Sequence, residues 1–182
     1  MEKMIEIIQT KDNFSIEELI IREAIKTLGD PFKNLTVKEV AKDLKDSGID
    51  AVLSDNIRRD ALQKFAYVSP MAACGLYYHV SAGEAQKTGD ARDTFVKLMK
   101  EIDALAVAMG VPFQVDIVTT NLQILDTLDP TASTSMQRDI YAGKSSEIDG
   151  LIYEVVRMGQ QYGVPVPTYE MVAARAKEQG LS

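Results

Sequence analysis

The sequence predicts an all-α protein, and three observations support that fold class. Apolar residues recur with helical spacing along nearly the whole chain, helix-start and helix-stop signals bracket successive segments, and alternating strand patterns are scarce. The two segments that do alternate, AYVS and VDIVTT, each lie inside a longer helical period. A length of 182 residues fits about one domain, and 46% hydrophobic with 26% charged residues is ordinary for a globular protein.

Two capping boxes mark the N-terminal helices. In such a box, a Ser or Thr at the start of a helix and an acid three residues later each bond the other's backbone N–H. Residues 15–18 (SIEE) match this pattern and open IEELIIREAIKTL, which ends at Gly29. Thr36 and Glu39 match it again and open VKEVAKDLKDS, which ends at Gly48. The sequence therefore predicts one helix after each box.

A long helix is expected next, over NIRRDALQKFAYVSPMAACGLYY, with Ser54 just before it. Pro70 lies inside this segment and is expected to kink or locally unwind it, because proline lacks the N–H that bonds the carbonyl four residues earlier. The longest stretch without Asp, Glu, Lys or Arg, residues 65–83, overlaps this helix. A helix that is apolar on all sides is normally buried, so this one is expected to be central.

Shorter helices complete the predicted fold. Ser81 and Glu84 form a third candidate capping box before a short helix, and residues 91–109 carry an apolar stripe that ends at Gly110. Further helices are expected near residues 114–128, 135–142, 146–162 and 169–179, each followed by a Pro or Gly.

The composition excludes several classes of function. With 20 Lys and Arg against 27 Asp and Glu, the net charge is −7, which offers no cationic surface for nucleic acid or anionic lipid. The single cysteine, Cys74, cannot form an internal disulfide, and the N-terminus lacks the pattern of a secretory signal. Ser, Pro and His interrupt the 19-residue uncharged stretch, which argues against a membrane span. We therefore expect a cytoplasmic protein that binds neither nucleic acid nor membranes.

Common cofactor and catalytic motifs are missing. No two of the eleven glycines are two residues apart, so there is no G-x-G-x-x-G, and no Gly-rich loop leads into a Lys-Ser/Thr pair. One His and one Cys cannot form a Cys/His zinc site, and no metal is expected. His79, the only histidine, is interpreted as a helix-end residue rather than a catalyst.

Lys64 stands out in the central helix. It shares a helical stripe with residues that are otherwise apolar or small, namely Ile57, Ala61, Val68, Met71 and Gly75. Partial burial at that position would tune its ammonium for proton transfer. The alternative is that its methylene stem covers apolar surface while the ammonium stays in water.

Glu147 and Ser135 stand out in the C-terminal part. Ser145 or Ser146 can cap the helix that follows, which places Glu147 in its first turn near the edge of a buried face. Alternatively, Glu147 only interacts favourably with the helix dipole, and Ser135 is only the N-cap of MQRDIYA. Both interpretations stay open at this point.

In combination, these residues resemble the C-terminal domain of the ketopantoate reductase family (2-dehydropantoate 2-reductases), from about Leu44 to the C-terminus. The strongest part comprises Ser135-Met136, Asp139, Gly143, Glu147-Ile148-Asp149 and the GVPVP at residues 163–167. Upstream, the same order and spacing hold for Gly48-Ile49, Asp55-Asn56-Ile57, Lys64 and Gly83-Glu84. The resemblance implies an all-helical fold like the C-terminal domain of 6-phosphogluconate dehydrogenase, without a Rossmann domain.

The resemblance implies an NADPH-dependent reduction of a 2-keto acid to a 2-hydroxy acid, as in pantothenate biosynthesis. Lys64 aligns with the family's catalytic lysine, expected to donate a proton to the carbonyl oxygen, where a cation also stabilises developing negative charge. Glu147 aligns with the substrate-binding acid and Ser135 with a serine that contacts the substrate. NADPH belongs to the Rossmann domain of such enzymes, so this chain alone is expected to bind no cofactor.

The sequence departs from the family pattern beside Lys64. The polar residues one and two turns after the lysine, asparagines in the best-known enzymes, correspond here to Val68 and Ala72. The usual tryptophan just before the lysine corresponds to Leu62. Loss of the amides removes hydrogen bonds for a polar substrate, which argues against ketopantoate itself.

Two hypotheses of function follow. Residues 1–34 are assigned to an N-terminal helical extension and residues 35–182 to the ketopantoate-reductase-like helical domain. Under the first hypothesis this is the substrate-binding and dimerisation domain of a 2-keto acid reductase, inactive alone, whether it is part of a longer enzyme or a separate gene product. Under the second it is a stand-alone helical interaction module that has lost catalysis. The resemblance also implies a homodimer formed through the helical domain.

Overall fold

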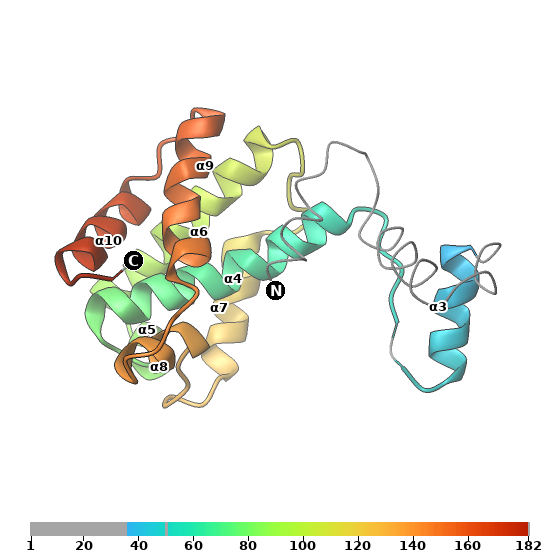
Figure 1. Cartoon of the computed structure of the whole chain (residues 1–182), viewed down its shortest axis with the longest axis horizontal. Helices are drawn as coiled ribbons and strands as arrows, with labels where there is room; N and C mark the ends of the chain where they lie inside the picture. The colour runs from blue at the N-terminus through green and yellow to red at the C-terminus, as the bar shows by residue number, and fades with distance from the viewer. Residues whose placement is uncertain (1–35, 50, 182) are drawn as a thin grey trace. The chain divides into compact units, whose positions relative to one another are not determined.

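The computed structural model describes residues 36–49 and 51–181, which consist of helices and the loops between them (Figure 1). These residues contain no strand, so the predicted all-α fold class is confirmed. Contacts between Cα atoms divide the chain into Met1–Ile57 and Arg58–Ser182. The helix expected after residue 15 and the boundary expected after residue 34 lie outside the described residues.

Helix α3 (Val37–Asp46) begins at the capping box that the sequence predicts. The Thr36 hydroxyl accepts the Glu39 N–H at 3.3 Å, and the Glu39 carboxylate accepts the Thr36 N–H at 2.7 Å. This backbone bond, together with a second bond from the Thr36 hydroxyl, lowers the pKa of Glu39 below its usual value. The second predicted box is therefore confirmed.

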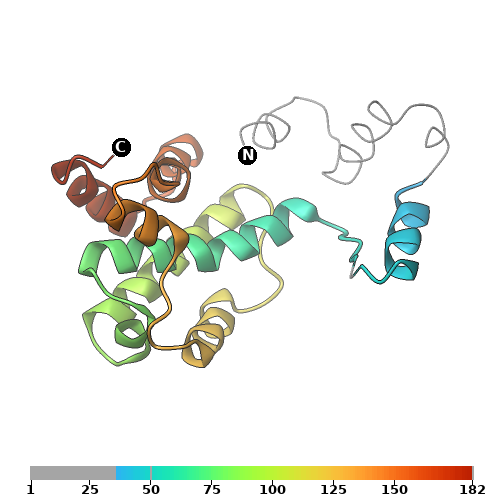
Figure 2. The ribbon, with the colours of Figure 1, turned by 60° about the horizontal axis from the view of Figure 1, so that its bottom comes forward.

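The remaining helices follow in the predicted order. They are α4 (Ile57–Tyr78), α5 (Ala82–Gln86), α6 (Asp90–Ala108), α7 (Ile117–Thr127), α8 (Ser135–Tyr141), the π-helical turn η2 (Asp149–Tyr153), α9 (Glu154–Tyr162) and α10 (Pro167–Glu178). Helix α4 runs through the middle of this group in both views (Figures 1 and 2). None of the helices in the described part of the chain is long and apolar enough to cross a membrane.

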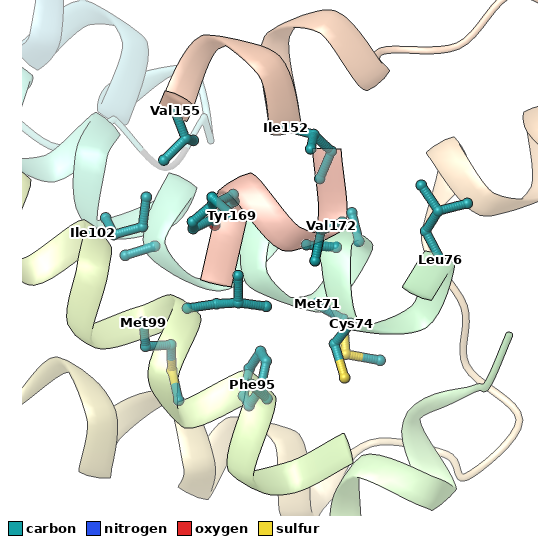
Figure 3. Close-up of a cluster of buried hydrophobic side chains, with 14 of the residues drawn as sticks. Met71, Cys74, Leu76, Phe95, Met99, Ile102, Ile152, Val155, Tyr169 and Val172 are labelled. Carbon is teal, nitrogen blue, oxygen red and sulfur yellow. The ribbon is translucent and has the colours of Figure 1, made fainter. Parts of the chain in front are cut away.

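The hydrophobic core lies where α4, α6, α9 and α10 meet. Every residue of α4 from Ser69 to Leu76 is buried, as expected for a central helix. Figure 3 shows side chains from these helices and from η2 gathered around Tyr169, which is fully buried. The labelled neighbours include Met71 from α4, Ile102 from α6 and Val155 from α9. Burial of such side chains contributes about 1.5–3 kcal/mol each.

Helix α4 stays helical across Pro70, so the local unwinding expected there is not observed. Because Pro70 has no N–H, the carbonyl of Ala66 loses its donor within the helix. The side chain of Asn121, which is 2% exposed on α7, donates its Nδ2–H to that carbonyl at 3.0 Å. An amide from a neighbouring helix thus replaces the missing backbone bond and joins α7 to α4.

Helix α10 begins with a residue that cannot cap it, because the N-cap is Val166. The buried carboxylate of Glu101 on α6 takes over that task. Its two oxygens accept the N–H groups of Thr168 at 2.8 Å and Tyr169 at 3.0 Å. A carboxylate at a helix N-terminus satisfies free N–H groups and is favoured by the helix dipole.

Two close approaches depend on glycine. A Cβ at Gly75 on α4 would lie 2.4 Å from Nε2 of Gln137, a buried side chain of α8 that donates to the Val80 carbonyl at 2.9 Å. A Cβ at Gly83 on α5 would lie 2.9 Å from Cβ of Pro130. Only a residue without a side chain lets α8 and the loop at Pro130 pack this closely.

The third predicted capping box, at Ser81 and Glu84, is wrong. Ser81 is the N-cap of α5, but its hydroxyl donates instead to the carbonyl of Pro130 at 2.7 Å. The Glu84 carboxylate pairs with Lys87 at 2.5 Å. The loop at Pro130 competes successfully for the serine, which a local sequence pattern does not reveal.

His79 follows the last residue of α4, as the sequence analysis expects of a helix-end residue. Its φ of 56° places it in the left-handed region, and the next N–H, of Val80, bonds the Gly75 carbonyl at 3.1 Å. This is the usual C-terminal motif of a helix, with histidine at the position that glycine normally takes.

We predict that Asn121→Ala lowers the free energy of unfolding by about 1–3 kcal/mol, because it leaves the buried Ala66 carbonyl without a donor. Urea denaturation measures the change. The control is the same substitution in a Pro70→Ala background, where residue 70 regains its N–H. The cost of Asn121→Ala should fall there by about 1 kcal/mol. An equal cost in both backgrounds would contradict the assignment.

Candidate functional site

Lys64 lines a surface hollow of about 410 Å³ between α4 and α7. Helix α4 contributes Asp60, Gln63 and Lys64 to its wall, and α7 contributes Thr120, Asn121 and Ile124. Among the residues that the structure describes, Lys64 makes no hydrogen bond or ion pair. The hollow therefore presents a cation whose hydrogen-bond donors remain available for a ligand.

Of the two interpretations of Lys64, partial burial is not observed, because its side chain is exposed. Burial along its stripe increases only later in α4: Val68 is half-buried, and Met71 and Gly75 are buried. Lys64 thus lies five residues before the fully buried part of the helix, which begins at Ser69. This agrees with the alternative in which the ammonium stays in water, where it can still hold an anionic group by charge and hydrogen bonding.

Asn121 is the buried residue among those of this hollow that sequence reasoning missed. Its position is fixed by its bond to the Ala66 carbonyl, two residues after Lys64 on α4. The sequence does contain a partial signal, since Pro70 requires some donor for that carbonyl. Nothing local to Pro70 indicates that the donor comes from a residue 51 positions later.

Glu147 immediately precedes the helical segment that starts at Ile148, and its side chain is exposed. The serine cap expected from Ser145 or Ser146 is not formed, because the helix start at Ile148 carries no side-chain cap bond. Among the described residues the Glu147 carboxylate has no hydrogen-bond or ion-pair partner. It is therefore free to accept hydrogen bonds from a ligand.

The two acids that follow Glu147 in the sequence, Asp149 and Glu154, both form ion pairs with one arginine. Arg157 binds both oxygens of Asp149, at 2.9 and 3.0 Å, and one oxygen of Glu154 at 2.6 Å. The bond from Arg157 lowers the pKa of Asp149. Glu147 is thus the acid of this segment that no cation neutralises, within the described residues.

Ser135 is the first residue of α8 rather than its N-cap, so the interpretation as a cap is wrong. The cap is Thr134, which forms a capping box with Gln137. The Ser135 hydroxyl is exposed and makes no hydrogen bond among the residues that the structure covers. A hydroxyl that is not needed for capping remains available to a ligand.

Lys64, Ser135 and Glu147 come from three elements, and within the described chain no hydrogen bond or ion pair joins any two of them. Helix α4 connects them: it carries Lys64, bonds η2, which follows Glu147, and packs against α8, which carries Ser135. The Ser69 hydroxyl donates to the Leu151 carbonyl at 2.6 Å, and Gly75 lies against Gln137 of α8. Described residues 36–49 and 51–181 include no group of three or more His, Cys, Asp or Glu suited to a metal.

Comparison with known families decides the assignment of the chain. Residues 56–179 match the family described as the ketopantoate reductase PanE/ApbA C-terminal domain. The chain belongs to this family. The match begins at the start of α4 and ends just after α10, so it includes all three candidate residues.

Individual relatives agree with the family. The chain is 22% identical over 171 residues to the 2-dehydropantoate 2-reductase of Aquifex aeolicus (strain VF5), covering 92% of this chain and 54% of the relative. The solved 2-dehydropantoate 2-reductase of Methylococcus capsulatus is 27% identical with a TM-score of 0.69, over 79% of this chain and 46% of that one. This chain therefore spans about half the length of these relatives.

A second kind of relative has a different name. A D-mandelate dehydrogenase, solved with NADH and anilino(oxo)acetate, is 26% identical with a TM-score of 0.69. The likeness covers 84% of this chain and 64% of that one. The helical fold is thus shared by proteins named for two different compounds, 2-dehydropantoate and D-mandelate.

Proposed function

We propose that this chain is the substrate-binding helical part of a nicotinamide-dependent 2-keto acid reductase. The observation that carries the proposal is the unpaired Lys64 ammonium in a hollow of a ketopantoate reductase C-terminal domain. Lys64 holds the proton that the carbonyl oxygen takes up when a 2-keto acid becomes a 2-hydroxy acid. Glu147 accepts hydrogen bonds from the substrate, and Ser135 contacts it. The cytoplasmic location stays a prediction.

NADPH is implied by the family for the complete enzyme, and the described residues of this chain do not fit it. They contain no strand, hence no strand, Gly-rich turn and helix of the kind that cradles a dinucleotide pyrophosphate. We therefore propose that the described part supplies substrate contacts and a proton, and that it has no activity by itself.

The absence of the family's polar residues one and two turns after Lys64 favours a 2-keto acid with an apolar substituent. Val68, one turn after Lys64, is a half-buried aliphatic side chain, and Ala72 is fully buried and offers no polar group. Across the hollow, Ile124 on α7 leaves 42% of its surface exposed. Val68 and Ala72 lack the amide that would satisfy a substrate hydroxyl at their positions, and the exposed Ile124 can cover an apolar group. The D-mandelate dehydrogenase relative, solved with anilino(oxo)acetate, supports the same class of substrate.

The alternative is a helical interaction module without a substrate. The exposure of Lys64 and the apolar side chains at Val68 and Ala72 also fit a domain that has lost catalysis. The two proposals differ in one respect that can be measured, which is whether the Lys64 hollow binds a keto acid.

We predict that phenylglyoxylate binds at this hollow and that Lys64→Met weakens the binding about tenfold or more, since a charge-assisted hydrogen bond is lost. NMR titration of the 182-residue chain should shift the amides near Lys64 and Asn121. Lys97→Met, at an exposed position of α6, is the matched control and should bind like the unchanged chain. NADPH should shift no amide. Equal binding by both variants would contradict the role of Lys64, and no binding by the unchanged chain would favour the interaction module.

Val68→Asn is predicted to shift the substrate preference beside Lys64. The amide restores a hydrogen-bond partner one turn after Lys64, so affinity for ketopantoate should rise and affinity for phenylglyoxylate should fall, each by about threefold or more. The same NMR titration measures both ligands. Val96→Asn, on a half-buried valine of α6, is the control and should leave the ratio of the two affinities unchanged. An unchanged ratio for Val68→Asn would contradict the assigned substrate class.

We also propose that the chain forms a homodimer, as the family resemblance implies. Exposed large apolar side chains such as Val107, which is 62% exposed, and Tyr141, which is 58% exposed, are available for such contacts. Light scattering should give about twice the mass of the 20.1 kDa chain. A mass near that of one chain over a wide range of concentrations would contradict the proposal.

A further inference from the structure

A buried hydroxyl on α4 connects three elements of the fold. Ser69 is fully buried, and its Oγ lies 2.6 Å from the Leu151 carbonyl oxygen and 2.6 Å from the Tyr169 hydroxyl. A serine hydroxyl has one proton, and a carbonyl oxygen can only accept. Ser69 therefore donates to Leu151, and Tyr169 donates to Ser69.

The first end of this chain of hydrogen bonds leads to Glu147. Leu151 is the third residue of the π-helical turn η2, and its N–H donates to the Glu147 carbonyl at 2.9 Å. The bonds thus continue from Ser69 through Leu151 to the backbone of the acid assigned to the substrate. Ser69 itself is five residues after Lys64 on the same continuous helix.

The other end is fixed in the core. The N–H of Tyr169 donates to the buried Glu101 carboxylate at 3.0 Å, which anchors the start of α10 to α6. Burial raises the pKa of the Tyr169 hydroxyl far above its usual value, so the phenol stays protonated and remains a donor. Neither Ser69 nor Tyr169 is exposed to solvent.

An apolar pair of similar volume would fill this part of the core without desolvating two hydroxyls. Instead, the Ser69 hydroxyl bonds one particular carbonyl of the π-helical turn η2. Such π-helical turns are rare and occur mostly as single turns inside α-helices. The bond to Leu151 ties the backbone of this turn directly to the buried part of α4.

We infer that Ser69 and Tyr169 are positioning residues, which fix η2 against α4 and so hold Glu147 in a constant place relative to Lys64. This inference rests on the proposed function for the roles of Lys64 and Glu147. The bonds themselves act on the backbone of η2, which can be observed without a ligand.

The test compares Ser69→Ala with Val172→Ala, a truncation in the same core that removes no hydrogen bond. NMR of the 182-residue chain, at a temperature where each variant is folded, reports amide exchange in η2 and the affinity for phenylglyoxylate. Ser69→Ala should accelerate exchange at Gly150 and Leu151 and weaken binding about tenfold, whereas Val172→Ala should change neither. Tyr169→Phe, which leaves Ser69 its proton for Leu151, should have a smaller effect in the same direction.

Equal effects of Ser69→Ala and Val172→Ala on exchange in η2 would overturn the inference. If the unchanged chain binds no keto acid, the proposed function fails, and the exchange data still decide whether Ser69 holds η2. If Ser69→Ala accelerates exchange in η2 but leaves the affinity unchanged, Glu147 is not positioned for the ligand and the inference is also overturned.

Discussion

Burial of the second half of α4 imposes a condition on every helix around it, because each polar group on that stretch must find a partner inside the protein. Pro70 leaves the Ala66 carbonyl without a helical donor, and Asn121 of α7 supplies one. Ser69 requires partners, and Leu151 of η2 and Tyr169 of α10 provide them. The polar requirements of one helix thus specify which neighbours pack on it and in which register, beyond what apolar contact alone would specify.

The elements of this fold were largely predictable from the sequence, because helix periods and terminal residues are local signals. Thr36 and Glu39 form their box because both partners lie within one turn. Ser81 does not, because the Pro130 carbonyl, 49 residues away, is the better placed acceptor. The need for a donor at Ala66 was also readable from Pro70, but its identity was not, since it depends on how α7 packs. No local signal indicated η2.

The sequence provides candidate residues for the site, whose roles stay predictions, but not their geometry. The resemblance identified Lys64, Ser135 and Glu147, and the family match includes all three. The periodic stripe through Lys64 did not reveal that its own members become fully buried only beyond Val68, because spacing shows which face points inward but not where the core ends. For Ser135, the neighbouring Thr134 is an equally good cap, and sequence alone could not choose between them.

The π-helical turn at residues 149–153 has the form left by a single-residue insertion into an α-helix. Each residue of an α-helix turns the chain by about 100° about the helix axis, so one extra residue rotates the segment before the turn by that angle relative to the segment after it. The core-facing side chains after the turn, such as Val155, can therefore keep their register while the segment entering the turn faces elsewhere. A one-residue deletion there would restore a regular helix and carry Glu147 around to a different side. The number of residues in this turn therefore contributes to the direction in which Glu147 points, together with the bonds that hold the turn.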